Sequence, residues 1–173
     1  IKIYTPYLAS EVGTPQRHAG KWDTSKYHMV ISTADSSGID VHVKAIYIEG
    51  LQVRLDLTSA TVNVAAIYIK GEASQSNNGW VTDCIIRGNA GFDAATGNFG
   101  IALCDTIGEW SSGSKGYVWN NIIYDFLNPN GSGNGEGIHM DDGSTTFYSY
   151  NNTAYNSATC YNALNGTVIA MNN

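Results

Sequence analysis

The chain has 173 residues and 19 glycines, and only 14% of its residues are charged, against about 25% in average proteins. Its hydrophobic content of 43% excludes a disordered chain, and no apolar run approaches the roughly 18 residues needed to span a bilayer. A net charge of −6, with nine scattered Lys and Arg residues, argues against nucleic acid as a partner.

Residues 1–37 are expected to form a first circuit of the repeat that occupies the rest of the chain, interrupted by a long loop from Leu8 to Lys26. The densest polar cluster of this region is the segment QRHAGKWD, residues 16–23. We interpret it as a loop pinned by Trp22 and by an Arg17–Asp23 pair. The alternative is a ligand-binding loop, because loops on a rigid scaffold commonly carry function.

Residues 38–173 contain an internal repeat, which is the main signal in the sequence. Four segments align: IEGLQV (48–53), VTDCII (81–86), VWNNII (118–123) and SYNNTA (149–154). Their third positions are Gly50, Asp83, Asn120 and Asn151, residue types that tolerate a left-handed backbone, so each copy is predicted to turn a corner there. The residues at the fourth position of these segments are Leu51, Cys84, Asn121 and Asn152. They predict a column of inward-facing side chains that begins apolar and ends as a ladder of asparagines.

A second set of segments follows each corner by 17 or 18 residues and shows apolar residues two apart, the period of a half-buried strand. Its members are GIDVHV (38–43), which precedes the first corner, AIYIKG (66–71), GIALCD (100–105), GIHMDD (137–142) and VIAMNN (168–173). Short strands that cannot bury their own apolar face can share one core when copies stack. The prediction is an all-β, right-handed, single-stranded parallel β-helix of about five coils.

The Asn-Asn corner followed by an alternating strand, as in VWNNIIYD and YNNTAYNS, resembles the repeat of the pectate-lyase-like superfamily of right-handed parallel β-helices. The resemblance covers about residues 38–173. It implies the fold but leaves the activity open, because the superfamily holds polysaccharide lyases, polygalacturonases, epimerases, tailspikes, adhesins and viral surface proteins. Neither end shows an amphipathic cap helix, so we expect a fragment of a longer chain or caps supplied by neighbouring subunits.

The segment GIHMDDGS (137–144) is the candidate catalytic cluster. Stacking the copies gives two outward columns and a third position: Asp40, Tyr68, Ala102, His139 and Ala170; then His42, Lys70, Cys104, Asp141 and Asn172; then Asp105 with Asp142. Close carboxylates could share a proton or flank a glycosidic bond. The favoured interpretation is structural: a solvated His139 beside an Asp-Asp-Gly turn in which Asp accepts backbone N–H groups and Gly143 supplies a positive φ. Ca²⁺ binding by the carboxylates is a further alternative. Apart from that alternative, we expect no metal site and no cofactor.

Comparison with enzymes of the superfamily weakens the catalytic hypothesis. Polygalacturonase-like sites imply four motifs: an Asn-Thr-Asp strand, an Asp-Asp pair, a Gly-His-Gly loop and an Arg-Ile-Lys strand. Only the Asp-Asp pair has a counterpart in this sequence, at Asp141 and Asp142. Pectate-lyase-like sites also imply an Arg or Lys beside carboxylate-bound Ca²⁺, and the nearest cation in the column is Lys70, two coils away.

Aromatic residues offer a different candidate site, for carbohydrate. A ring can cover the apolar face of a sugar while amides meet its hydroxyl groups. The candidates are Trp110, Trp119, Tyr68 and Trp22. The alternative is that these rings stack along a strand face for structural reasons.

The leading functional hypothesis is a non-enzymatic domain of an extracellular, cell-surface or virion protein, with a structural, decorative or carbohydrate-contacting role. The rival is a polysaccharide lyase or glycoside hydrolase that acts through Asp141, Asp142, Asp105 and His139. A third hypothesis is a subunit of a homo-oligomer, a trimer or filament, that associates through open ends or a tyrosine-rich face.

Overall fold

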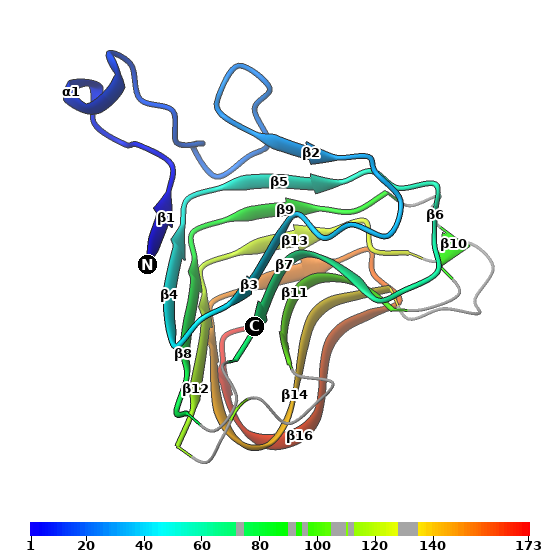
Figure 1. Ribbon diagram of the computed structural model, residues 1–173. Coiled ribbons are helices and arrows are strands. Elements are labelled where there is room, and N and C mark those ends of the chain that lie inside the picture. The colour runs from blue at the N-terminus through cyan, green and yellow to red at the C-terminus, as the bar shows by residue number, and fades with distance from the viewer. Residues whose placement is uncertain (72–74, 90–92, 95–96, 105–109, 111–112, 128–134) are drawn as a thin grey trace.

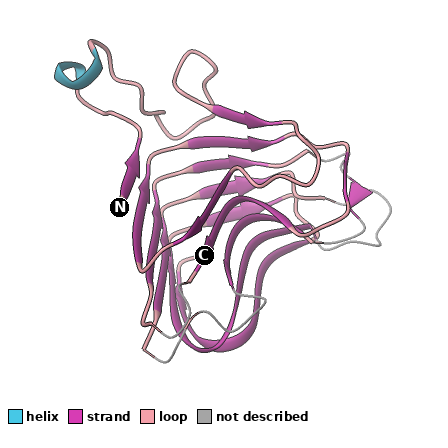
Figure 2. Ribbon diagram, viewed as in Figure 1, coloured by secondary structure: helices cyan, strands magenta, loops and turns pink. Residues whose placement is uncertain are grey.

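The computed structural model describes residues 1–71, 75–89, 93–94, 97–104, 110, 113–127 and 135–173, and their regular secondary structure is almost entirely β-strand (Figure 2). One short helix, α1 (Ala9–Val12), lies near the N-terminus, and no helix among the described residues is long and apolar enough to cross a membrane. The strands are β1 (Lys2–Tyr4), β2 (Met29–Ile31), β3 (Ile39–His42), β4 (Ala45–Glu49), β5 (Gln52–Leu55), β6 (Ser59–Ala60), β7 (Val64–Lys70), β8 (Asn78–Thr82), β9 (Ile85–Arg87), β10 (Asp93–Ala94), β11 (Asn98–Cys104), β12 (Lys115–Trp119), β13 (Ile122–Tyr124), β14 (Gly135–Tyr150), β15 (Thr153–Tyr155) and β16 (Thr159–Met171).

The strands pair in parallel. Apart from β6 and β10, which pair with each other in a small separate sheet, they form three faces that the chain visits in a fixed order (Figure 1). Face 1 consists of β1, β4, β8, β12 and the second halves of β14 and β16. Face 2 consists of β2, β5, β9, β13 and β15, and face 3 of β3, β7, β11 and the first halves of β14 and β16. β14 and β16 bend from face 3 into face 1, which curls the largest sheet. These parallel strands in curled sheets are compatible with a β-helix or a similar solenoid.

The corners lie where the repeat predicts them. Gly50, Asp83, Asn120 and Asn151 have φ values of 70°, 54°, 57° and 53°, in the left-handed region that Gly, Asn and Asp adopt at least cost. Each corner amide donates to a carbonyl of the next repeat, for example Asp83 N to Trp119 O at 3.2 Å. The corner therefore turns the chain from face 1 into face 2 without interrupting the hydrogen bonds between repeats.

The predicted inward column is also confirmed. Leu51, Cys84, Asn121 and Asn152 are all buried just after their corners. Burial raises the pKa of Cys84 to about 12, so this thiol stays protonated and packs as a small apolar side chain. The asparagines form a ladder, in which Asn121 Oδ1 accepts from Cys84 N at 2.9 Å and Asn121 Nδ2 donates to Asn152 Oδ1 at 2.9 Å and to Val81 O at 2.9 Å.

The second strand set is correct for its first four members and wrong for the last. Ile39, Ile67, Ile101 and Ile138 are neighbours in register on face 3. The next residue in this row is Tyr161, whereas VIAMNN lies on face 1, where Ala170 pairs with Ser149 and Met171 with Tyr150. The outward columns therefore end at Asn162 and Asn165 rather than at Ala170 and Asn172.

The last repeat differs because its circuit is shorter. Asn151 and Asn172, bonded corner neighbours, are 21 residues apart, whereas Asn120 and Asn151 are 31 apart. Only residues 156–158 separate β15 from β16, whereas β13 and β14 are separated by residues 125–134. Because the connection from β15 to β16 is shorter, the chain reaches each face earlier in this repeat. The segment VIAMNN, expected on face 3, therefore lies on face 1.

The asparagine ladder provides a test of this architecture. Replacing Asn121 by Ala should lower the free energy of unfolding by about 3 kcal/mol, because it leaves Cys84 N–H and Val81 C=O buried without their partner. Urea denaturation followed by circular dichroism measures the change. Asn165→Ala is the matched control: this side chain donates to Asp141 Oδ1 at an exposed site, so its loss should cost under about 1 kcal/mol. Equal effects of the two substitutions would contradict the buried ladder.

Candidate functional site

The outer surface of face 1 carries a row of aromatic side chains. Tyr47, Trp80, Tyr117 and Tyr148 occupy one register position on four neighbouring strands, and we call them the aromatic column. Their neighbours in the chain, such as Ile46 and Ile48, point inward and are buried, so strand alternation turns the rings outward. Because parallel strands lie about 4.8 Å apart, residues in register place their rings at stacking distance.

Most of the rings in the column cover one another's faces. The Trp80 and Tyr117 rings are parallel within 2° with centroids 5.2 Å apart, and Tyr117 and Tyr148 are within 9° at 4.9 Å. Tyr47 is tilted by 37° from Trp80 at 6.4 Å. Such pairs stabilise a fold by about 0.5–1.5 kcal/mol each. Parallel stacking along the row leaves ring edges, rather than ring faces, for contact with a ligand.

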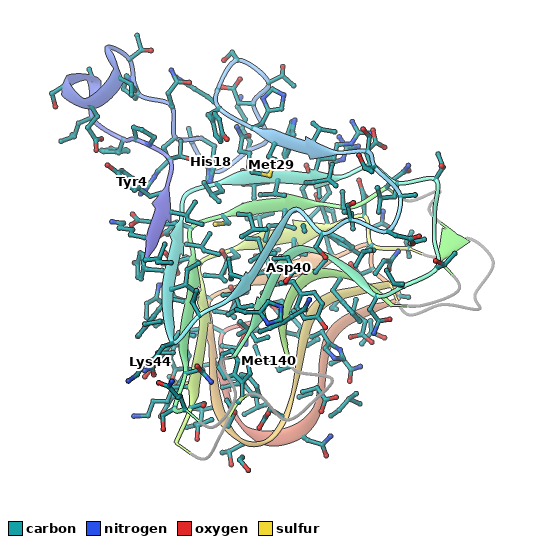
Figure 3. All side chains as sticks on the ribbon, viewed as in Figure 1. Tyr4, His18, Met29, Asp40, Lys44 and Met140 are labelled. Carbon is teal, nitrogen blue, oxygen red and sulfur yellow. The ribbon has the colours of Figure 1, made fainter. Side chains whose placement is uncertain are left out.

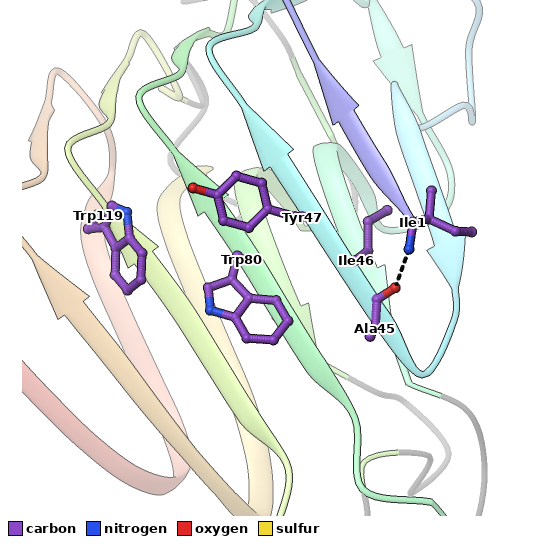
Figure 4. Close-up of a pocket in the computed structure, with 6 residues that line it drawn as sticks. All are labelled: Ile1, Ala45, Ile46, Tyr47, Trp80 and Trp119. Atoms are coloured by element: carbon purple, nitrogen blue, oxygen red, sulfur yellow. Dashed lines mark hydrogen bonds between the residues drawn. The ribbon is translucent and has the colours of Figure 1, made fainter.

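Trp119 lies beside this stack, in register with Thr82 and Tyr150 rather than with the rings of the column. It lies two residues after Tyr117 on β12, and its ring is inclined by 63° to Tyr117 with centroids 5.7 Å apart. Together with Tyr47 and Trp80 it lines a shallow pocket of about 290 Å³, whose other lining residues are Ile1, Ala45 and Ile46 (Figure 4). Trp119 therefore lies beside an open, largely apolar hollow.

Charged side chains lie around the aromatic column. Lys2 precedes Tyr47 in the same row, with Nζ 5.3 Å from the centre of the Tyr47 ring and 3.0 Å from Glu49 Oε2. Lys115 lies on the outer side of β12 with Tyr117 and Trp119, and its side chain is exposed. The face thus combines aromatic surface with exposed hydrogen-bond donors, although the whole chain has a net charge of −6.

The structure places the four predicted carbohydrate-contacting residues in different surroundings. Trp119 belongs to face 1 and is half-buried. Trp110, expected on an exposed loop, is 2% exposed and packs against Phe147 in the core. Tyr68, on face 3, is 4% exposed beneath Lys70, whose Nζ lies 4.3 Å from the ring centre. Trp22 contacts His28 edge-on at 5.8 Å in the N-terminal region. The structure therefore does not bring these four rings together.

His139 is not the solvated side chain that we expected. It is 8% exposed, its ring stacks on Phe99 at 4.5 Å, and Nδ1 lies 2.5 Å from Glu136 Oε2. A carboxylate only accepts hydrogen bonds, so Nδ1 is the protonated nitrogen of this pair. Asn162 Nδ2 donates to the other Glu136 oxygen at 2.8 Å. The outward side of face 3 therefore holds a buried polar cluster that ties β14 to β16.

Asp141 and Asp142 make local contacts that fit the structural interpretation of GIHMDDGS. Asp142 Oδ1 accepts from Ser144 N at 2.9 Å and from Thr145 Oγ1 at 3.2 Å, as in an Asx turn. Asp141 Oδ1 accepts from Asn165 Nδ2 at 2.7 Å. The positive φ expected at Gly143 occurs instead across the strand pair, at Gly166, where φ is 92°.

The remaining carboxylate of the candidate catalytic set, Asp105, lies outside the described residues. Among the residues that the structure describes, His, Cys, Asp and Glu side chains form no group of three or more that could hold a metal ion. The geometry of Asp141 and Asp142 is thus accounted for by turn and cross-strand hydrogen bonds.

The sequence patterns did not single out Glu136 or the column as a whole. The column had a signal: an aromatic residue stands three positions before every corner, at Tyr47, Trp80, Tyr117 and Tyr148. The aligned segments began one residue too late to include it. Glu136 had no comparable signal, because its contact with His139 joins residues three apart on β14 and does not follow the two-residue alternation of a strand.

The buried cluster on face 3 can be tested by mutation. Glu136→Ala should lower the free energy of unfolding by about 3 kcal/mol, because His139 Nδ1 and Asn162 Nδ2 lose their buried acceptor. Asp141 lies on the same strand and accepts a single hydrogen bond, from Asn165, at an exposed site. Asp141→Ala should therefore cost about 1 kcal/mol or less. Urea denaturation measures both, and a smaller loss for Glu136→Ala than for Asp141→Ala would contradict the role assigned to the cluster.

The candidate site therefore consists of the aromatic column, Trp119 and the adjoining pocket on face 1. Strand register and ring geometry bring these residues together on one face. Comparison of the chain with protein-family models, with curated proteins and with solved structures finds no match.

Proposed function

We propose that this chain is a right-handed parallel β-helix domain that contacts carbohydrate through face 1 and performs no catalysis. The observation that carries the proposal is Trp119 and its pocket, set beside a column of stacked aromatic rings. The setting we propose is an extracellular, cell-surface or virion protein. Low charge and polar, Gly-rich and Asn-rich loops support this setting.

The chemistry of face 1 suits a sugar ligand in three respects. The inclined Trp119 ring can cover the apolar face of a pyranose, which the mutually stacked rings of Trp80 and Tyr117 cannot do. The tyrosine hydroxyl groups of the column can donate to and accept from sugar hydroxyls. The exposed Lys115 supplies a further donor in the same outward row of β12.

Stacking for stability alone is the competing explanation of the aromatic column, and face 2 provides the comparison. Tyr124 and Tyr155 stack there within 4° at 5.1 Å, with Arg87 over Tyr124 at 5.6 Å. This pair is a structural stack of the same kind, without a ring turned out of it. A ligand-binding role for face 1 therefore depends on Trp119 more than on the column.

Binding to polysaccharides tests the proposal. Trp119→Ala should weaken glycan binding at least about tenfold, the equivalent of about 1.4 kcal/mol, because it removes the free ring face. A glycan array followed by isothermal titration with the best ligand measures the loss. Tyr124→Ala, on face 2, is the matched aromatic control and should keep the affinity of the native chain. Equal affinities of the native chain and Trp119→Ala, or no binding to any glycan, would refute the proposal.

A separate experiment tests for catalysis. The native chain should release no fragments from acidic or neutral polysaccharides, with or without Ca²⁺, because Asp141 and Asp142 are engaged in structural hydrogen bonds. Size-exclusion chromatography of the digested polymers provides the measurement. If the native chain depolymerises a polysaccharide and a chain carrying Asp141→Asn and Asp142→Asn does not, the protein is a lyase or hydrolase and the proposal of a non-catalytic domain is wrong.

A further inference from the structure

The stack of repeats has two ends, and each consists of strands that pair on one side only. In the described part of the chain, β1, β2 and β3 are the outermost strands at one end, and β15 and β16 are the outermost strands at the other. We call these sets the leading end and the trailing end. Figure 3 labels one residue on each strand of the leading end: Tyr4, Met29 and Asp40. Both ends present backbone groups that a further strand could pair with.

The hydrophobic core is also open at both ends. At the trailing end, Ala163 and Ala170 of β16 line a largely apolar hollow of about 260 Å³ together with Ile138 and Met140 of the preceding repeat. Apolar side chains that pack against the core but are only partly buried occur at each end: Ile3, Met29, Ile31, Val41 and Val43 on or beside the leading strands, and Ala154 and Tyr161 on the trailing strands. Each end therefore exposes apolar surface that a further repeat would cover.

β16 has none of the residue types that usually keep an edge strand from pairing. Natural edge strands are protected by charged side chains or by proline. The 13 residues of β16, Thr159–Met171, include no Lys, Arg, Asp, Glu or Pro. Val168, Ile169 and Met171 are exposed on this strand, Met171 by 59%. A long, uncharged edge strand with exposed apolar side chains is a surface for association.

Charge distinguishes the two ends. Residues 1–44 contain five Lys or Arg and four Asp or Glu residues, a balance of +1. Residues 135–173, which carry β14, β15 and β16, contain Glu136, Asp141 and Asp142 and no Lys or Arg, a balance of −3. Two trailing ends would bring like charges together, whereas a leading end presents charge of the opposite sign to a trailing end. Charge therefore favours contact between unlike ends.

The long segment between β1 and β2, residues 5–28, is fastened to later strands rather than to the leading end. It corresponds to the loop expected at Leu8 to Lys26, and Figure 1 shows it projecting beside β4 and β5. Arg17, expected to pair with Asp23, donates instead to Glu49 Oε1 on β4 at 2.5 Å. His18 Nε2 lies 2.8 Å from the carbonyl oxygen of Asp83, at the corner of the next repeat. These contacts hold the segment at the side of the stack.

We propose that the trailing end of one molecule binds the leading end of a second copy of this chain. In this contact β16 pairs in parallel with β1 and β3 of the second copy and β15 pairs with its β2, so each face gains a further repeat. Because the two surfaces differ, every complex keeps one free end of each kind, and association produces open chains rather than closed dimers. The contact does not depend on the carbohydrate site proposed for face 1.

The register of the repeats determines which residues meet at the junction. On face 1, Ile3 stands at the start of the inward row that ends at Ala170. On face 3, Val41 stands at the start of the inward row that ends at Ala163. Continued by one repeat, the stack places Ile3 of the second copy beside Ala170, and its Val41 beside Ala163. The junction therefore sets apolar side chains against each other and closes the open ends of both cores.

Sedimentation of the native chain and of blocked variants tests the proposal. The mean mass of the native chain should rise with concentration beyond that of a dimer. Val41→Lys at the leading end and Ala163→Lys at the trailing end should each weaken self-association at least about a hundredfold, because the junction would bury a charge without a partner. Val62→Lys is the matched control: Val62 is exposed but lies between β6 and β7, away from the end strands, so this variant should associate like the native chain.

Mixing the two blocked variants identifies the ends that meet. An equimolar mixture restores one native junction, between the trailing end of Val41→Lys and the leading end of Ala163→Lys, and should therefore stop at a heterodimer. Circular dichroism checks that each variant folds, and Ile3→Lys takes the place of Val41→Lys if the latter does not. A native chain that stays monomeric at every concentration, a Val41→Lys variant that associates like the native chain, or a mixture of folded variants that stays monomeric would each overturn the proposal.

Discussion

The parallel hydrogen bonding of each repeat to the next is the constraint on which the rest of the structure depends. Every circuit must bring its backbone back in register with the circuit before it, because an unpaired buried N–H or C=O costs free energy. The corners meet this requirement, since their amides continue the hydrogen bonds from one repeat to the next, as from Asn120 N to Tyr150 O. Residue types that accept a left-handed backbone are therefore needed at the same point of each circuit.

Register also decides the chemistry of the surfaces. When residues of one type recur at one position, they become direct neighbours, so inward asparagines form a ladder and outward aromatic residues form a column. The column stabilises face 1 but covers its own ring faces, which separates its structural role from the ligand contact proposed for Trp119. The same rule produces the Tyr124–Tyr155 stack on face 2.

The segment between β1 and β2, residues 5–28, follows a different principle from the repeats, and its Arg17 pairs with Glu49 rather than with Asp23 as expected. Its position depends on side chains that reach across the sequence, such as Arg17 to Glu49 and Gln52 to Asp23, rather than on a continuous ladder. A segment held by a few polar anchors opens at a lower free energy than strands held by a full set of backbone bonds.

The sequence by itself determined the features that repeat. The corner residues, the inward column from Leu51 to Asn152 and the register of Ile39 with Ile67, Ile101 and Ile138 could all be predicted, because strand alternation and left-handed turns depend on local residue type. Tertiary structure alone decided the features that do not repeat: the shortened last circuit, the burial of His139 beside Glu136 and the partner of Arg17. These depend on the length of a connection, a contact between residues three apart on β14 and the path of a loop, none of which is encoded in the period of the sequence.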